Sequence, residues 1–160
     1  MAAATTAAVA FGASALASAD SPAAPSATSD EMPLLVEDFN YPGADRVLKT
    51  EGIKLKRGDG HITLAECGRT TGQIIAMTVA DGSVGRKGEY CFEVNAKSGY
   101  LTLELPRIFA FEAGGQAIKA SLTAEGQTET VAIPKDGYKS VGEGLPGGSQ
   151  SVLVEIRVTG

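Results

Sequence analysis

The stretch from Lys87 to Pro106, KGEYCFEVNAKSGYLTLELP, has the clearest pattern in the chain. Apolar and polar residues alternate over 89–94 and again over 101–105, and a polar Asn-Ala-Lys-Ser-Gly connection joins the two segments. A period of two is typical of strands that bury one face, and two such runs joined by a short turn predict a β-hairpin. We expect its apolar side chains to form the centre of the core: Tyr90, Phe92, Val94, Leu101, Leu103 and Leu105.

The rest of the chain also reads as short strands separated by turns. Glycine accounts for 20 of the 160 residues, which is typical of a chain with many tight turns. The regular alternation of strands and helices that a parallel α/β sheet requires does not occur. We therefore predict a mainly β fold, an antiparallel, jelly-roll-like β-sandwich, with a closed barrel as the alternative. The further strands are expected at 34–39, 61–67, 73–79, 108–112, 117–123, 128–133 and 151–158.

The last of these strands alternates strictly, from Ser151 to Val158. Its pattern places Glu155 and Arg157 on the solvent side. The residues expected to face the core are Val152, Val154, Ile156 and Val158.

One short helix is predicted near the beginning of the domain, between Pro42 and Glu51. Proline is favoured in the first turn of a helix, and Gly52 is suited to terminate it. Ala44, Val47 and Leu48 then share one face of a helix of two to three turns.

The N-terminal region differs in composition from the rest. Residues 1–19 are Ala-rich and uncharged, and they end in Ala-Ser-Ala before Asp20, as a secretory signal peptide does. A disordered Ala-rich tail is the alternative. Because no Lys or Arg precedes the apolar run, we expect the natural start to lie upstream of Met1. Residues 20–31 read as a disordered Pro/Ala/Ser linker, so the β-sandwich domain is expected over 32–160. The predicted localisation is secreted, with no membrane span in the mature chain.

The two cysteines, Cys67 and Cys91, are expected to form a structural disulfide, because an even number in an exported chain favours pairing. The alternation of their segments places both on the polar side of their strands. A redox-active pair is the alternative, but a Cys-x-x-Cys spacing, which lowers a thiol pKa, is absent from the sequence.

Composition excludes some classes of partner and site. The net charge of −5 provides no overall basic character for nucleic acid or an anionic membrane. No Asp-x-Asp-x-Asp run occurs, so we expect no metal, and no motif indicates a cofactor. The absence of Trp argues against a sugar-stacking cleft. The expected partner is an extracellular protein or glycan.

The single histidine, His61, is the strongest candidate for catalysis. Asp59 lies two residues earlier, where it can orient the imidazole as the acid of a catalytic triad does. A turn followed by an ordinary histidine at the end of a strand is the structural alternative, and no nucleophile elbow supports the catalytic one.

Four blocks of the sequence resemble small secreted proteins of unknown function from actinomycete bacteria. The resemblance spans residues 39–158 and implies bacterial origin and export, with no functional residue to carry over. The blocks are Tyr-Pro-Gly-Ala-Asp-Arg at 41–46, Gly-Ile-Lys-Leu-Lys-Arg-Gly-Asp-Gly-His-Ile at 52–62, Gly-Tyr-Leu-Thr-Leu-Glu-Leu-Pro at 99–106 and Leu-Val-Glu-Ile-Arg at 153–157.

Two functions follow as hypotheses. The first is a secreted, non-catalytic binding module whose partner contacts the loops at 81–87 and 141–148, since loops on a rigid sheet scaffold commonly carry binding residues. The alternative is a secreted hydrolase or lyase that uses His61 with Asp59 or Glu66. A concave pocket around His61 favours the enzyme, and a flat or packed histidine favours the module.

Overall fold

The computed structural model describes residues 39–160, and the account below concerns that part of the chain. Four expectations therefore fall wholly or mostly outside the described residues. They are the signal peptide at 1–19, the linker at 20–31, the domain start at residue 32 and the strand at 34–39, of which only Phe39 is described.

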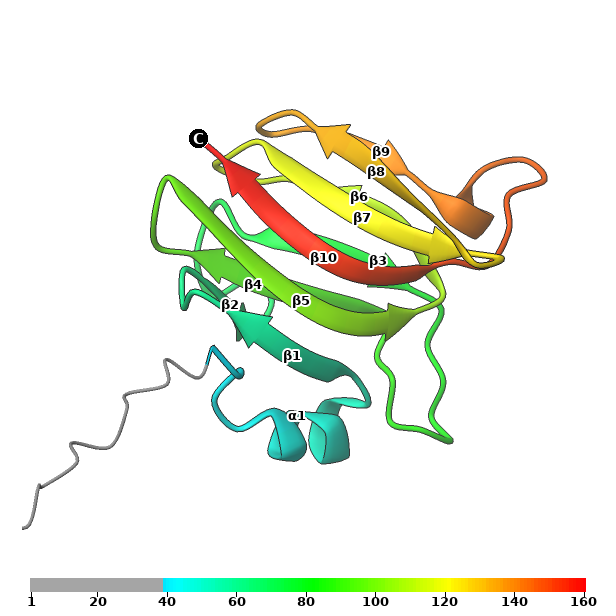
Figure 1. Ribbon diagram of the computed structural model, residues 1–160, viewed down its shortest axis with the longest axis horizontal. Helices are drawn as coiled ribbons and strands as arrows, with labels where there is room; N and C mark the ends of the chain where they lie inside the picture. The colour runs from blue at the N-terminus through cyan, green and yellow to red at the C-terminus, as the bar shows by residue number, and fades with distance from the viewer. Residues whose placement is uncertain (1–38) are drawn as a thin grey trace, which may run out of the picture. The chain divides into compact units, whose positions relative to one another are not determined.

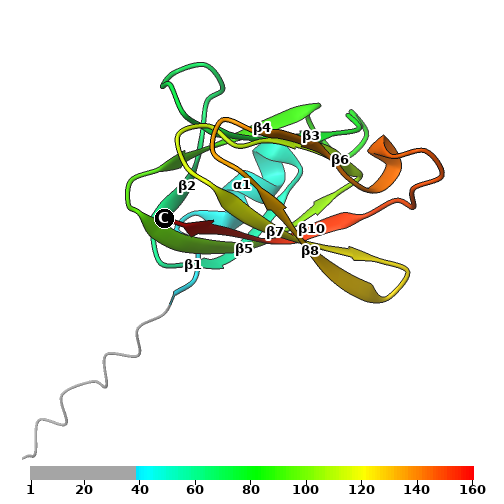
Figure 2. The same cartoon turned by 90° about the horizontal axis from the view of Figure 1, so that it is seen from above.

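Ten strands form two five-stranded sheets in the described part, and neighbouring strands in each sheet run antiparallel. The two sheets lie face to face, as Figures 1 and 2 show, which confirms the predicted β-sandwich. Sheet A has the order β1 (Lys54–Gly58), β5 (Ser98–Pro106), β10 (Val152–Thr159), β7 (Ile118–Ala124) and β8 (Gln127–Ile133). Sheet B has the order β2 (Ile62–Ala65), β4 (Glu89–Val94), β3 (Ile74–Thr78), β6 (Ile108–Glu112) and β9 (Tyr138–Ser140).

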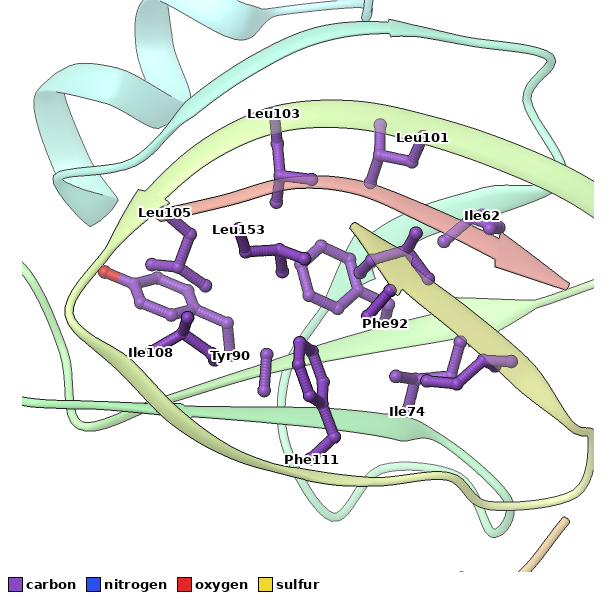
Figure 3. Packing of buried hydrophobic residues seen from close by; sticks show 14 of the residues in the cluster. Ile62, Ile74, Tyr90, Phe92, Leu101, Leu103, Leu105, Ile108, Phe111 and Leu153 are labelled. Atoms are coloured by element: carbon purple, nitrogen blue, oxygen red, sulfur yellow. The ribbon is translucent and has the colours of Figure 1, made fainter. Parts of the chain in front are cut away.

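The core lies between the two sheets (Figure 3). Phe92 and Phe111 from sheet B are fully buried opposite the leucines of β5. Of the six side chains expected at the centre of the core, five are at most 2% exposed and Val94 packs against them partly buried. The alternation in the sequence therefore identified the buried faces of β4 and β5 correctly.

The predicted hairpin over 87–106 is nevertheless wrong. β4 pairs with β2 and β3 in sheet B, whereas β5 pairs with β1 and β10 in sheet A. The connection at 95–97 therefore crosses from one sheet to the other, and the two apolar faces meet across the core. Alternation reports only that a strand buries one face, and the same pattern suits two neighbours in one sheet or two strands in facing sheets.

The last strand, β10, departs from its expected alternation. Its register shifts between Leu153 and Glu155 against both neighbours. Against β7 the extra residue is Val154, which forms a β-bulge, whereas against β5 the extra residue lies on β5. Ile156 and Val158 are buried as expected, but Leu153 takes the core position before the bulge. The expectation for Val152 and Val154 is wrong, because an extra residue reverses which side chains face inward.

The predicted helix is present as α1 (Ala44–Glu51), with a short 3-10 helix, η1 (Gly142–Gly144), later in the chain. Gly43 and Gly52 flank α1 in the left-handed conformation, which glycine adopts without strain. Figure 1 shows α1 beside β1, and Figure 2 shows it between the planes of the two sheets. The helix thus covers the side of the sandwich where the edge strands β1 and β2 lie.

Cys67 and Cys91 form the expected disulfide, with Cα atoms 5.1 Å apart. Cys67 follows the end of β2, and Cys91 lies on the outer face of β4, where it is paired with Ala65 and Ile75. The parity argument placed Cys91 on the correct face of the sheet. That face is covered there, however, because Cys91 is fully buried.

Candidate binding site

A groove of about 810 Å³ lies between α1 and the edge of sheet B at β2, and it continues onto the outer face of that sheet. The helix and its approach provide one wall through Tyr41, Arg46 and Val47. The other side is formed by β2 and β4 and continues across β3 and β6. Its largely apolar floor contains Ala65, Met77, Cys91 and Phe109, and Leu64 of the inner face lies where the floor meets the helix.

Two tyrosines hold α1 at this distance from the sheet. The hydroxyl of Tyr41 accepts a hydrogen bond from the backbone N–H of Leu64 at 2.9 Å, which fixes the start of the helix on β2. The hydroxyl of Tyr90 donates to the carbonyl of Glu51 and accepts from the N–H of Lys87, which fixes the end of the helix on β4. Both ends of the helical wall are therefore fastened to sheet B.

Charged side chains border the apolar floor. Lys87 and Glu51 form an ion pair, and the hydrogen bond to Glu51 raises the pKa of the Lys87 ammonium. Arg46 on the helix and Glu89 on β4 also line the groove, and within residues 39–160 neither belongs to an ion pair. The groove therefore presents an unpaired cation and an unpaired carboxylate to a ligand.

The two loops predicted to contact a partner, 81–87 and 141–148, meet beside one end of this groove. Arg107 joins them, because its guanidinium makes two hydrogen bonds to the Glu143 carboxylate, at 2.7 and 2.8 Å, and lies near Asp81. The hydrogen bonds from Arg107 lower the pKa of Glu143. Val84 and Leu145 are large apolar residues of these loops, and they are 55% and 49% exposed.

Asp59 and His61 lie together but outside the groove. The Asp59 carboxylate accepts hydrogen bonds from the backbone N–H groups of His61 and Tyr100, each at 3.1 Å. The His61 Nδ1 atom lies 3.4 Å from this carboxylate and 3.0 Å from the carbonyl oxygen of Ser98. These contacts fasten the end of β1 to the start of β5.

Glu66, the other carboxylate considered for catalysis, is separated from His61. The two residues flank opposite ends of β2, whose four residues span about 13 Å. The Glu66 side chain forms an exposed ion pair with Arg69 instead. His61 lines neither this groove nor the smaller cavity of about 270 Å³ near Gln73 and Asp136.

The described part of the chain, residues 39–160, contains no group of three or more His, Cys, Asp or Glu side chains arranged to hold a metal ion. It also contains no helix long and apolar enough to cross a membrane.

Sequence reasoning missed the groove because it treated the outer face of sheet B as an ordinary polar surface. A signal was present in β3, where Ile74 and Ala76 face the core while Ile75 and Met77 are apolar on the opposite face. A strand that is apolar on both faces indicates that both are covered. Nothing in the sequence indicated that α1 would form the facing wall.

Comparisons with known proteins identify no family. No protein-family model and no curated protein sequence matches the chain. Among solved structures, it is similar to an antifungal protein from Streptomyces tendae, determined by NMR. The match has 19% sequence identity and a TM-score of 0.42, and it covers 61% of this chain and 99% of the other. At this level of similarity, no activity is carried over.

Proposed function

We propose that this chain is an extracellular, non-catalytic binding module that holds a segment of a partner protein in the groove between α1 and sheet B. The groove itself is the observation that supports the proposal, because it combines an apolar floor with a few charged groups at its border. Such a combination is typical of sites where apolar contact supplies affinity and polar groups fix orientation.

The groove chemistry favours a polypeptide over other partners. Val47, Leu64 and Met77 offer contacts for apolar side chains, and the unpaired Arg46 and Glu89 suit residues of opposite charge. Two exposed apolar residues of the bordering loops, Val84 and Leu145, extend the contact surface. A glycan remains the second candidate partner, and the experiment below separates the two.

An extracellular location is supported by two features of the chain. The Cys67–Cys91 disulfide suits an oxidising compartment, where structural disulfides persist. Residues 1–19 have the composition of a secretory signal peptide. We accordingly place cleavage after Ala19 and the folded domain after the linker at 20–31.

The geometry at His61 supports a non-catalytic role. The Asp59 carboxylate already accepts two backbone hydrogen bonds, and the imidazole lies away from the groove. A hydrolase or lyase needs its general base within reach of a bound substrate, so a ligand in the groove would be out of reach of His61.

The proposal is tested by selecting ligands on the immobilised protein from a phage-displayed random peptide library and from a panel of soluble polysaccharides. Ala65→Trp fills the groove floor, and Glu89→Arg reverses an unpaired charge at its border. Lys49→Trp is the matched control, because Lys49 is exposed on α1 and does not line the groove. Circular dichroism and thermal melting check that each variant is folded.

We expect selected peptides to bind the wild-type protein and Lys49→Trp equally, and at least about tenfold more weakly to both groove variants. Selection of polysaccharides alone would overturn the choice of a protein partner, and binding indifferent to both groove variants would overturn the site. Cleavage of a bound ligand that disappears in His61→Ala would establish the enzyme instead.

A further inference from the structure

Each sheet of a sandwich ends in two edge strands, whose outward N–H and C=O groups attract further strands unless they are protected. Three of the four edges are protected within residues 39–160. β1 contains a bulge, and Asn40 bridges to Arg57 along its edge. β2 has only four residues, and its Leu64 N–H is bonded to Tyr41, while β9 has only three residues.

The fourth edge, β8, is protected only by one long contact, from Lys139 to the carbonyl oxygen of Ala132. Its seven residues pair with β7 in continuous register, without a bulge. It contains no Pro, Lys or Arg, which commonly discourage pairing at an edge, and its one charged residue is Glu129. In the described part of the chain, β8 forms the free border of sheet A, on the opposite side from β1 (Figure 1).

The turn before β8 determines which backbone groups point outward. Glu125 and Gly126 both have positive φ, 52° and 79°, as in the two-residue type I′ hairpin turn. In such a hairpin the pair that closes the turn, Ala124 and Gln127, exchanges backbone hydrogen bonds, and every second pair does the same. The outward N–H and C=O groups therefore belong to the residues between them: Thr128, Thr130 and Ala132.

We propose that β8 pairs antiparallel with the β8 strand of a second copy of this chain, about a two-fold axis at Thr130. This register places Thr130 opposite Thr130 of the second copy, and Thr128 opposite Ala132. The outward N–H and C=O groups on both strands then find partners, as a self-complementary two-fold interface requires. The result is one sheet continuous across both copies.

Charge complementarity favours a second copy as the occupant. Glu129 lies opposite Leu122 and therefore on the inner face of sheet A. Lys139 lies on β9, and its Nζ reaches across to the carbonyl oxygen of Ala132 at 3.4 Å. In the proposed register Glu129 of one copy lies opposite Val131 of the other, next to that ammonium. Lys139 then releases the long contact to Ala132 and pairs with the carboxylate of the second copy.

Sedimentation of the full chain from micromolar to millimolar concentration tests the proposal, with a monomer–dimer equilibrium as the expected result. Thr130→Pro removes an outward N–H and is expected to leave a monomer, whereas Thr130→Val keeps the N–H and is expected to dimerise normally. Thermal melting shows whether each variant is folded.

Charge reversal provides a second test that does not depend on proline. Glu129→Lys and Lys139→Glu are each expected to raise the dimer dissociation constant about tenfold or more, since each acts at two symmetric positions. The double reversal is expected to restore dimerisation, and Lys135→Glu in the adjacent turn serves as the control. A monomer at every concentration would overturn the proposal. It would also be overturned by a dimer whose dissociation constant is unchanged by Thr130→Pro and by both single charge reversals.

Discussion

Tyr90 reaches from the buried face of β4 to the last residue of α1, where its hydroxyl donates a hydrogen bond to the carbonyl of Glu51. The same hydroxyl accepts the N–H of Lys87 at 2.9 Å, and the Lys87 ammonium pairs with the Glu51 carboxylate. A core residue thus fastens the helix that forms one wall of the groove. Figure 3 shows the ring of Tyr90 packed beside Leu105 and Ile108.

Replacing Tyr90 with Phe should therefore destabilise the protein while leaving the ring packing intact. The lost hydroxyl leaves the Lys87 N–H and the Glu51 carbonyl without this partner, which costs about 1–3 kcal/mol. Urea denaturation measures the free energy of unfolding. Tyr100→Phe is the control, because no hydrogen bond involves the Tyr100 hydroxyl within residues 39–160, and its change should stay within about 0.5 kcal/mol. Equal effects of the two variants would contradict the role given to Tyr90.

The same residue predicts how stability depends on alkaline pH. Burial raises the pKa of the Tyr90 phenol above its ordinary value of 10.0. A raised pKa in the folded state contributes stability that is fully present below the unfolded pKa and is lost as pH rises through the folded one. The stability advantage over Tyr90→Phe should be constant at neutral pH and shrink above about pH 10. Denaturation of both proteins across this pH range measures the difference in their free energies of unfolding. A difference that grows with pH would contradict a raised pKa of the Tyr90 phenol.

The sequence predicted the local features of the fold, but not how distant strands pair. Local alternation identified the buried face of β4 and β5, and Pro42 and Gly52 identified α1, because these signals act within a few residues. It did not identify the sheet to which each strand belongs, because pairing across the chain depends on the whole core. The disulfide was predictable from an even number of cysteines in a chain that was expected to be exported. The groove was not, since it depends on where α1 packs.

The bulge in β10 buries Leu153 where the alternation of the sequence placed Val154, and mutation of the two residues tests this difference. Leu153→Ala should cost about 2–5 kcal/mol, because it removes a fully buried side chain from the core. Val154→Ala should cost clearly less, because Val154 is the extra residue of the bulge against β7 and its side chain is partly exposed. Chemical denaturation of the two variants measures this order. If Val154→Ala cost more than Leu153→Ala, Val154 would be the core residue, as the strict alternation in the sequence predicts.

Reduction of the disulfide should lower the stability of the domain. Cys67 and Cys91 are 24 residues apart, and the chain-entropy relation for a loop of that length gives about 3.5 kcal/mol. Thermal melting with and without dithiothreitol measures the loss. The Cys67→Ala, Cys91→Ala double variant should melt lower than the oxidised protein and show no response to dithiothreitol. An unchanged melting temperature on reduction of the wild type would contradict a stabilising disulfide.

Gly52 ends α1 where the 81–87 loop crosses it, so this position should tolerate a side chain poorly. Its φ is 67°, and an added Cβ would lie 2.4 Å from the carbonyl oxygen of Val84, a backbone atom. Gly60 is a matched control, because its φ is 80° and an added Cβ would meet nothing within 4 Å. Both Ala variants carry the backbone strain of about 1–2 kcal/mol, but only Gly52→Ala must also displace the loop. Denaturation should show the larger loss for Gly52→Ala, and amide exchange should show faster exchange across 82–86 in that variant alone. Equal losses and unchanged exchange would mean that the loop does not rest on the helix.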